Sequence, residues 1–504
     1  MAPTETYQLL ERSSRAEDDD DHLQLQESAG ATEQVISLEA AGVNELRRGL
    51  GSWDAMAIVV SVIVGAGIFA SPGVVLGTCG SVGLGLLSWV IAGMLATASS
   101  LVYCELGAMI PSAGGDFSYL REAFGDTVAF SWAFTSFTVQ KPASLAIVST
   151  VVGNYATAIV LGEDDSTLTG ASSLRVKIFA TLYVVTLTAI NVLPITCVAK
   201  LQDGLALTKP VLVGGLSILS GIYAVRAPAT VRANFGANLW DGGRPMDMGP
   251  SIFAALWAFN GWSNLSFMAE EMAEPQRQLP RALLGGMLFV VVVYLLCNIC
   301  YLSVLPAFES RDTVPSLVSS PVAAVSTAAE AARLVLPTGL AVVAPAAVAA
   351  FISISGVGSS NVTVMTGGRY LYAVARDGQA PYALSRLSRW QTPYVALWAQ
   401  AAMGIALCWL PGSALGELMS YFGVSSWLYY LGTALALLRL RRSQPDRPRP
   451  YRAPLVCVLV CVVASVALIS STFIAQPLPT IGSLGFCLLS WPVKKLLDRS
   501  QRAI

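Results

Sequence analysis

The sequence predicts an all-α polytopic membrane protein with about twelve transmembrane helices. Of its 504 residues, 54 % are hydrophobic and 12 % are charged, and the mean hydropathy is +0.61. Soluble domains usually contain about 25 % charged residues. Apolar runs long enough to cross a hydrocarbon core about 30 Å thick recur along the chain. Lysines and arginines favour one side of these runs, as expected for a polytopic protein.

Residues 1–50 are predicted to form a disordered, acidic, cytosolic tail. They hold 11 of the 32 acidic residues and 4 of the 31 basic ones, and they lack the apolar core of a signal peptide. The tail contains Glu5-Thr-Tyr-Gln-Leu-Leu10, in which Tyr7 to Leu10 fits a sorting pattern, but such short strings are common by chance. Whether this pattern is used stays open.

The composition also excludes several kinds of chemistry. The only histidine, His22, lies in the tail, so the remaining chain offers no histidine base or metal ligand. No basic face exists outside short loops, which argues against nucleic-acid binding. We therefore expect no enzyme activity, no cofactor and no metal.

A transmembrane domain is predicted over residues 51–495, followed by a cytosolic C-terminus at 496–504. The apolar runs that predict its helices lie at 54–77, 83–109, 127–158, 176–195, 202–225, 250–269, 282–305, 338–372, 393–411, 416–438, 453–475 and 478–494. With a cytosolic N-terminus, nineteen lysines and arginines fall in inner segments and seven in outer loops. Both termini are therefore expected in the cytosol.

The first run contains the helix-weakening sequence Gly65-Ala66-Gly67, followed by Pro72. It matches a dinucleotide fingerprint on paper, but no strand precedes it and its flanks are membrane-apolar. Unwound backbone within a membrane must be buried in protein or line a cavity. The half-helix that starts beyond the break would offer free N–H groups and a positive dipole end to a carboxylate.

The sixth run contains a matching interruption at Asn260-Gly261, flanked by aromatic residues. Paired breaks at corresponding positions favour an inverted-repeat transporter with a binding site near the bilayer midplane. The repeats would span 54–225 and 250–438, and two extra helices would lie at 453–494. The alternative is glycine-mediated helix packing, which is common in membranes.

Charged residues inside apolar runs are costly and mark candidate functional positions. Lys209 lies well inside the fifth run, where its ammonium group is expected to occupy the place of a coupling Na⁺. Lys141 in the third run and Glu105 near the inner end of the second are further candidates. Snorkelling to an interface is the alternative for a lysine. The pair Glu270-Glu271 is interpreted as an inner gate or a loop contact.

These motifs together resemble those of a known family. The ordered set comprises Ile63-Val-Gly-Ala-Gly-Ile-Phe69, Glu105-Leu-Gly-Ala-Met-Ile-Pro-Ser-Ala-Gly-Gly-Asp116, Lys141-Pro-Ala-Ser144, Gln202-Asp203 with Lys209, Gly261-Trp-Ser-Asn-Leu-Ser-Phe-Met-Ala-Glu-Glu-Met272, Asn361 with Arg369, and Ala375-Arg-Asp-Gly-Gln-Ala-Pro381. From about Leu46 to Lys495 the chain resembles the L-type amino acid transporters (light-chain type) of the amino acid–polyamine–organocation superfamily, including fungal methionine permeases.

The resemblance implies the LeuT-type 5+5 inverted repeat and Na⁺-independent transport of L-amino acids by alternating access, often as exchange. The implied substrate-binding residues are Ile63, Gly65, Ala66, Gly67, Trp257, Ala258 and Asn260. The backbone amides of Ala66 and Gly67 would hold the α-carboxylate of the substrate. The carbonyls of Ile63, Trp257 and Asn260 would accept hydrogen bonds from its α-ammonium group. The Trp257 side chain would act as an aromatic gate, and Lys209 would replace sodium.

Two departures from the animal members affect the partner and the substrate. The loop Gly162–Gly170 lacks the cysteine that bonds to a heavy chain, so we expect no disulfide-linked partner and a chain that functions alone. Trp257 and Asn260 replace residues typical of animal members. Since no acid is expected at the pocket floor, large neutral amino acids, methionine included, are the predicted substrates.

Three alternatives remain open at this point. A proton-coupled permease of the same fold would use Lys209 or Glu105 as its titrating group. A receptor that transports little would signal through the acidic tail. The plasma membrane is the expected location, with an endolysosomal or vacuolar membrane as the alternative.

Overall fold

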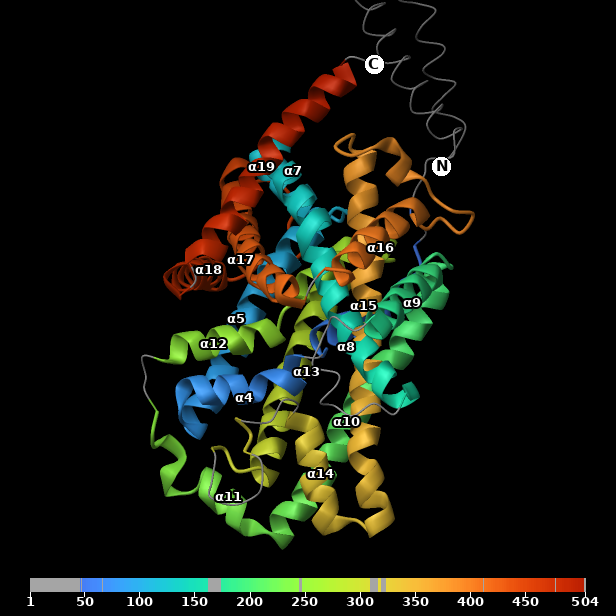
Figure 1. Ribbon diagram of the computed structural model, residues 1–504. Helices are drawn as coiled ribbons and strands as arrows, with labels where there is room; N and C mark the ends of the chain where they lie inside the picture. The colour runs from blue at the N-terminus through green and yellow to red at the C-terminus, as the bar shows by residue number, and fades with distance from the viewer. Residues whose placement is uncertain are drawn as a thin grey trace, which may run out of the picture. The chain divides into compact units, whose positions relative to one another are not determined.

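The protein is described from a computed structural model. It describes residues 46, 48–65, 67–161, 174–243, 247–308, 316–318, 323–410, 412–475 and 477–502. The acidic tail with its sorting pattern, residue Ala66 and the loop 162–173 lie outside these residues. Figure 1 shows the helical arrangement.

The described residues form helices and contain no β-strand beyond one isolated bridge between Leu50 and Met272. In chain order the elements are α3 Ser52–Ile63, α4 Gly67–Cys79, α5 Val82–Met109, α6 Asp116–Phe124, α7 Asp126–Thr135, η1 Ser136–Gln140, α8 Lys141–Leu161, α9 Leu174–Asn191, α10 Ile195–Arg226, α11 Pro228–Phe235, η2 Ala237–Trp240, α12 Met248–Ala258, η4 Trp262–Glu271, α13 Pro275–Val304, α14 Ala323–Val335, α15 Thr338–Arg376, η5 Tyr382–Ser385, α16 Tyr394–Cys408, α17 Gly412–Ser443, α18 Leu455–Ala475 and α19 Pro477–Arg502.

The predicted all-α membrane fold is confirmed. Each of the twelve predicted apolar runs coincides with one or more of these helices. Within the described residues, α5, α9, α10, α13, α15 and α18 are each long and apolar enough to cross a membrane. The helices of the other predicted runs are shorter or less apolar than these six, because helix breaks and polar groups interrupt those runs.

Three of the predicted runs, the first, the third and the sixth, are each divided into separate helical elements. The first run ends as α3 at Ile63 and resumes as α4 at Gly67, so Pro72 lies within α4 and not at the break. The third run passes from α7 through the π-helix η1 into α8. Single π-helical turns within α-helices are frequent at functional sites.

The sixth run departs from the predicted helix 250–269. α12 ends at Ala258, and Gly261 has a φ of +128°, a conformation that L side chains rarely adopt. The chain continues as the 3₁₀-helix η4. The Gly261 carbonyl accepts both the backbone N–H and the side-chain amide of Asn264, each over 3.0 Å.

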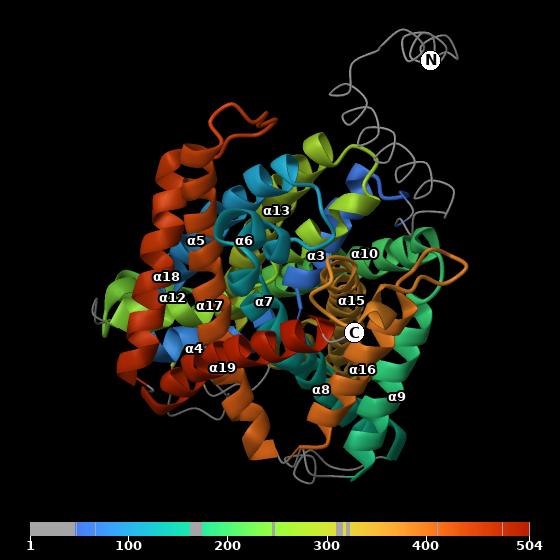
Figure 2. The same ribbon diagram turned by 90° about the horizontal axis from the view of Figure 1, so that it is seen from above.

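Helix packing brings the two breaks together. α13 packs against both α3 and α5, while α4 packs against α12, and Figure 1 shows these last two helices side by side. Seen from above, α5, α17 and α18 gather on one side and α9, α10, α15 and α16 on the other (Figure 2). The helix ends at Ile63 and Ala258 both contact Tyr294 of α13.

Candidate functional site

The two helix breaks face a common cavity of about 180 Å³. A Cβ atom placed on Gly67, the first residue of α4, would lie 2.8 Å from the Cα atom of Ala258, the last residue of α12. Only glycine therefore permits this approach. The first N–H groups of α4 have no partner within their own helix, so this end of the cavity is suited to an anion.

The carbonyl of Val64, inside the first break, is held by a buried lysine. Lys209 of α10 is 1 % exposed, and its Nζ donates to the Val64 carbonyl over 2.8 Å. The same ammonium group lies 3.0 Å from the Ser355 hydroxyl and 3.3 Å from the Ser355 carbonyl of α15. Lys209 thus binds the backbone of the first break and joins α10 to α15.

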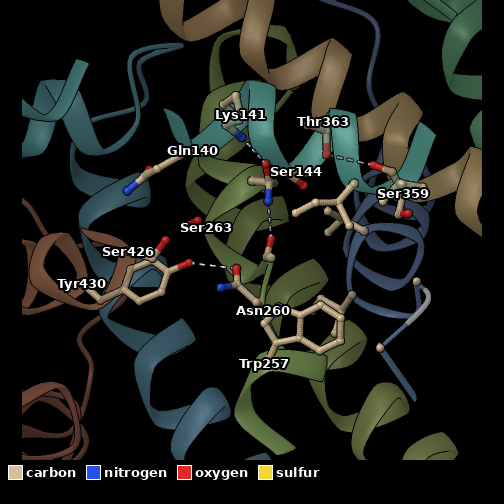
Figure 3. Close-up of a pocket in the computed structure, with 18 of the residues that line it drawn as sticks. Gln140, Lys141, Ser144, Trp257, Asn260, Ser263, Ser359, Thr363, Ser426 and Tyr430 are labelled. Atoms are coloured by element: carbon tan, nitrogen blue, oxygen red, sulfur yellow. Dashed lines mark hydrogen bonds between the residues drawn. The ribbon is translucent and has the colours of Figure 1, made fainter. Parts of the chain in front are cut away.

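The second break presents a polar and an aromatic side chain to the cavity. The Asn260 side-chain oxygen accepts a hydrogen bond of 3.1 Å from the Tyr430 hydroxyl (Figure 3). Trp257 lines the cavity and is 42 % exposed, so it leaves this side of the site accessible. In Figure 3, Trp257 and Lys141 lie on opposite sides of the cavity.

The cavity also contains a cation and an acid. Lys141, directly after the π-helix η1, donates to the Asn264 side-chain oxygen over 2.5 Å and to the Thr366 hydroxyl over 3.0 Å. Asp116, at the start of α6, accepts hydrogen bonds from Tyr103 over 2.5 Å and from Thr433 over 2.8 Å. Both residues line the cavity. The expectation of a pocket without an acid is therefore wrong, because Asp116, the first residue of α6, lines it.

Ion pairs close the end of the domain where the basic segments lie. Arg369 and Glu271 form a fully buried bidentate pair with distances of 2.8 and 3.1 Å. Arg376 pairs with Glu270 over 2.6 Å, and the Glu270 carboxylate also accepts the Ala113 N–H. These contacts join α15 to η4 and to the loop before α6, as the inner-gate interpretation of the two glutamates requires.

Glu105 forms ion pairs away from the cavity. Its carboxylate is buried, pairs with Arg441 and Arg449, and accepts the Ala453 N–H over 2.7 Å. It joins α5 to α17 and to the segment before α18, and it is not among the residues that line the cavity.

Most of the predicted binding residues meet at one place. Ile63, Gly65, Gly67, Trp257, Ala258 and Asn260 all line the cavity, whereas Lys209 lies behind the first break. Ala66 is outside the described residues. The roles assigned to these groups stay predictions. The sequence did not identify Asp116 as a cavity residue, although Asp116 ends one of the motifs that carry the resemblance.

Comparison with known proteins decides the family. Residues 50–489 match the family model for amino acid permeases. The chain belongs to the amino acid permease family. The match covers almost all of the predicted transporter domain, and it establishes the chain as an amino acid transporter and not an enzyme.

Relatives within this family support the predicted L-type resemblance. The chain is 32 % identical to the mouse b(0,+)-type amino acid transporter 1, with 86 % of this chain and 84 % of that protein covered. It is 30 % identical to the human b(0,+)-type amino acid transporter 1, over 88 % of this chain and 86 % of the relative. It is 28 % identical to the human large neutral amino acids transporter small subunit 2, over 92 % and 83 %.

One expectation does not agree with these relatives. The name "small subunit" describes a protein that works with another subunit, which conflicts with the expectation that this permease functions alone. The cysteine-free loop on which that expectation rested lies outside the described residues.

Proposed function

We propose that this permease carries neutral L-amino acids, large ones such as methionine included, by Na⁺-independent exchange. One observation carries the proposal: two helix breaks face one cavity, and a lysine ammonium is bound to the backbone of the first break. A fixed cation at that place makes a mobile sodium ion unnecessary. The opposite charges of Lys141 and Asp116 cancel within the lining, which favours substrates without a net side-chain charge.

The transport cycle would alternate access to the cavity by moving one group of helices against the other. In the predicted orientation, with cytosolic termini, the Arg369–Glu271 and Arg376–Glu270 pairs lie on the inner side. This arrangement would correspond to a state closed to the cytosol, with Trp257 as the accessible aromatic gate. Opening inward would require separation of these pairs. The two predicted repeats, 54–225 and 250–438, would supply the two moving groups of helices. The membrane would be the plasma membrane, with an endolysosomal or vacuolar membrane as the alternative.

The test is uptake of a labelled amino acid panel into proteoliposomes that contain the purified full chain. We expect uptake of methionine and other large neutral amino acids only when amino acid is present inside, unchanged when choline replaces sodium. Uptake that required a sodium gradient would contradict the proposal. Activity of the purified chain would also show whether a second subunit is needed.

A proton-coupled permease is the second candidate, because Asp116 and Lys141 are titratable groups that line the cavity. It predicts uptake into vesicles without internal amino acid, driven by an imposed pH gradient. Counterflow without any pH gradient supports the exchanger instead. Glu105 pairs with two guanidinium groups and is not among the residues that line the cavity, so it is not placed to exchange a proton there.

A further inference from the structure

We infer that the end of α6 and the last turns of α17 form a binding groove for an anionic phospholipid of the surrounding membrane. The two helices pack against each other and lie side by side in Figure 2. Between them is an open groove of about 610 Å³, separate from the central cavity. The groove is lined by an aromatic ring, two leucines, two arginines and a serine, namely Phe124, Leu435, Leu438, Arg439, Arg442 and Ser443.

One face of α17 carries both an apolar and a basic part of this groove. Four of the lining residues are spaced by three or four positions and therefore share one helix face: Leu435, Leu438, Arg439 and Arg442. Leu435 and both arginines are exposed. From the rise per residue of an α-helix, Leu435 and Arg442 lie about 10 Å apart along the axis. The groove thus has an apolar end and a basic end, as a binding site for an acyl chain and its phosphate requires.

The two arginines of the groove lack partners in the described part of the chain. Neither Arg439 nor Arg442 forms an ion pair or a hydrogen bond with another described residue. Arg441 and Arg449, whose side chains are 11 % and 10 % exposed, both pair with Glu105. These two arginines, which turn toward the protein, are matched by a carboxylate, whereas the two that face the groove are not.

The acidic residues closest in sequence to the ring of the groove already have partners. Glu122 pairs with Arg447, and Asp126 pairs with Arg121 over 2.9 Å. Phe124 lies between these two acids in the chain. Since both carboxylates are bound to other arginines, the positive charge of the groove is available to a ligand.

Phe124 holds one of the guanidinium groups in place. The Arg439 Cζ atom lies 5.5 Å from the centroid of the Phe124 ring, which is a cation–π distance. A guanidinium group above a ring keeps N–H donors at its edge, where a pair of them can bind two phosphate oxygens. Arg442, three positions further along the same face, brings a second cation to this end of the groove.

These features together select a lipid with a net negative charge. The arginines favour an anion, while the two leucines offer an apolar surface that a soluble phosphate would leave uncovered. A zwitterionic lipid also has a phosphate, but its ammonium group would lie close to the two arginines. In the predicted orientation the groove lies at the cytosolic leaflet, whose anionic lipids bind to basic pockets between transmembrane helices.

A lipid bound in the groove would stabilise the packing of α6 against α17. Both elements contribute to the central cavity, which Asp116 lines from α6 and Tyr430 from α17. Asp116 also accepts a hydrogen bond of 2.8 Å from Thr433 of α17. A ligand that binds only the folded chain raises its stability, so the lipid should raise the temperature of unfolding.

The test measures lipid binding to the purified full chain in detergent by native mass spectrometry. Dioleoyl phosphatidylserine and dioleoyl phosphatidylcholine are the probes, because they have the same acyl chains and differ in net charge. We expect the wild type to bind phosphatidylserine roughly tenfold more tightly. In Arg439→Gln/Arg442→Gln this affinity should fall roughly 10- to 30-fold, since each basic residue near an anionic surface contributes about a factor of five. The affinity for phosphatidylcholine should change by less than about twofold.

Arg386→Gln/Arg389→Gln is the matched control. It removes the same charge from two exposed arginines that are also three positions apart, and Arg389 also lies over a ring, that of Trp390, at 4.3 Å. Neither arginine lines the groove, so this variant should keep the wild-type affinity. An equal loss in both double variants, or no loss in Arg439→Gln/Arg442→Gln, would overturn the inference.

The wild type alone provides a second test, which serves if a double variant does not accumulate. Phosphatidylserine with a diazirine on one acyl chain should label peptides that contain Phe124 or residues 435–443. Labelling confined to other segments would refute the site. Phosphatidylserine should also raise the temperature of unfolding, whereas millimolar inorganic phosphate should not. An equal rise with phosphate would indicate a soluble anion and contradict a lipid site.

Discussion

Replacing Gly67 by alanine tests whether the close approach of α4 and α12 forms the binding site. The added Cβ would lie 2.8 Å from the Ala258 Cα and 3.0 Å from its Cβ, whereas ordinary contacts begin at 3.4 Å. The first turn of α4 must therefore move by about 0.6 Å, because backbone atoms cannot swing aside as a flexible side chain can. Such overpacking typically costs about 1–3 kcal/mol.

The effect on transport should be larger than the effect on stability. The N–H groups of α4 and the carbonyl of Ala258 would be shifted relative to each other, and a misplacement of about 1 Å can reduce activity about 100-fold. We expect Gly67→Ala to lower kcat/KM for methionine exchange by roughly 10- to 100-fold, and Gly67→Val to abolish exchange.

The assay is counterflow in proteoliposomes, with thermal unfolding of the purified protein measured in parallel. Gly214→Ala in α10 is the matched control, because its Cβ would meet no atom within 4 Å. Alanine is a better helix former than glycine by about 1 kcal/mol, so this control should be as stable as the wild type or more so. If Gly67→Ala exchanged methionine with wild-type kinetics, the two breaks could not form the site described above.

Three further predictions concern the charged groups. Lys209→Met should abolish sodium-free exchange while the protein still folds, because the Val64 and Ser355 oxygens lose their cation; wild-type exchange by this variant would contradict the sodium-replacement role. Glu271→Gln or Arg369→Met alone should each lower the free energy of unfolding by about 3–5 kcal/mol, whereas the double variant should lose clearly less than the sum, as a double-mutant cycle would show. Burial raises the pKa of Asp116, in α6 between two spans, from 3.8 to about 6. The folded chain then holds this proton more tightly than the unfolded chain, so the contribution to stability is greatest below about pH 4 and is lost as the pH rises to 6, a change of at most about 3 kcal/mol. Asp116→Asn should flatten this part of the stability profile, and an unchanged profile would contradict the assignment.

The sequence by itself determined the membrane class, the apolar segments and the places where two helices break. These features depend on local chemistry. Twelve apolar runs must be helical to satisfy their backbone groups in lipid, and the glycines at 65, 67 and 261 weaken helices wherever they occur. The buried position of Lys209 was also predictable, because charged side chains in the middle of apolar runs face the interior of the helix bundle.

The tertiary structure alone decided which groups surround the cavity and which backbone oxygens remain available there. Asp116 lines the cavity from the start of α6, and Tyr294 contacts Ile63 and Ala258, which lie 231 and 36 positions away from it in the sequence. The Ile63 carbonyl, which was expected to bind substrate, already accepts the Gly65 N–H and lies 2.7 Å from the Tyr294 hydroxyl. No pattern in the sequence could show this, since donors and acceptors are paired through contacts between residues far apart in the chain.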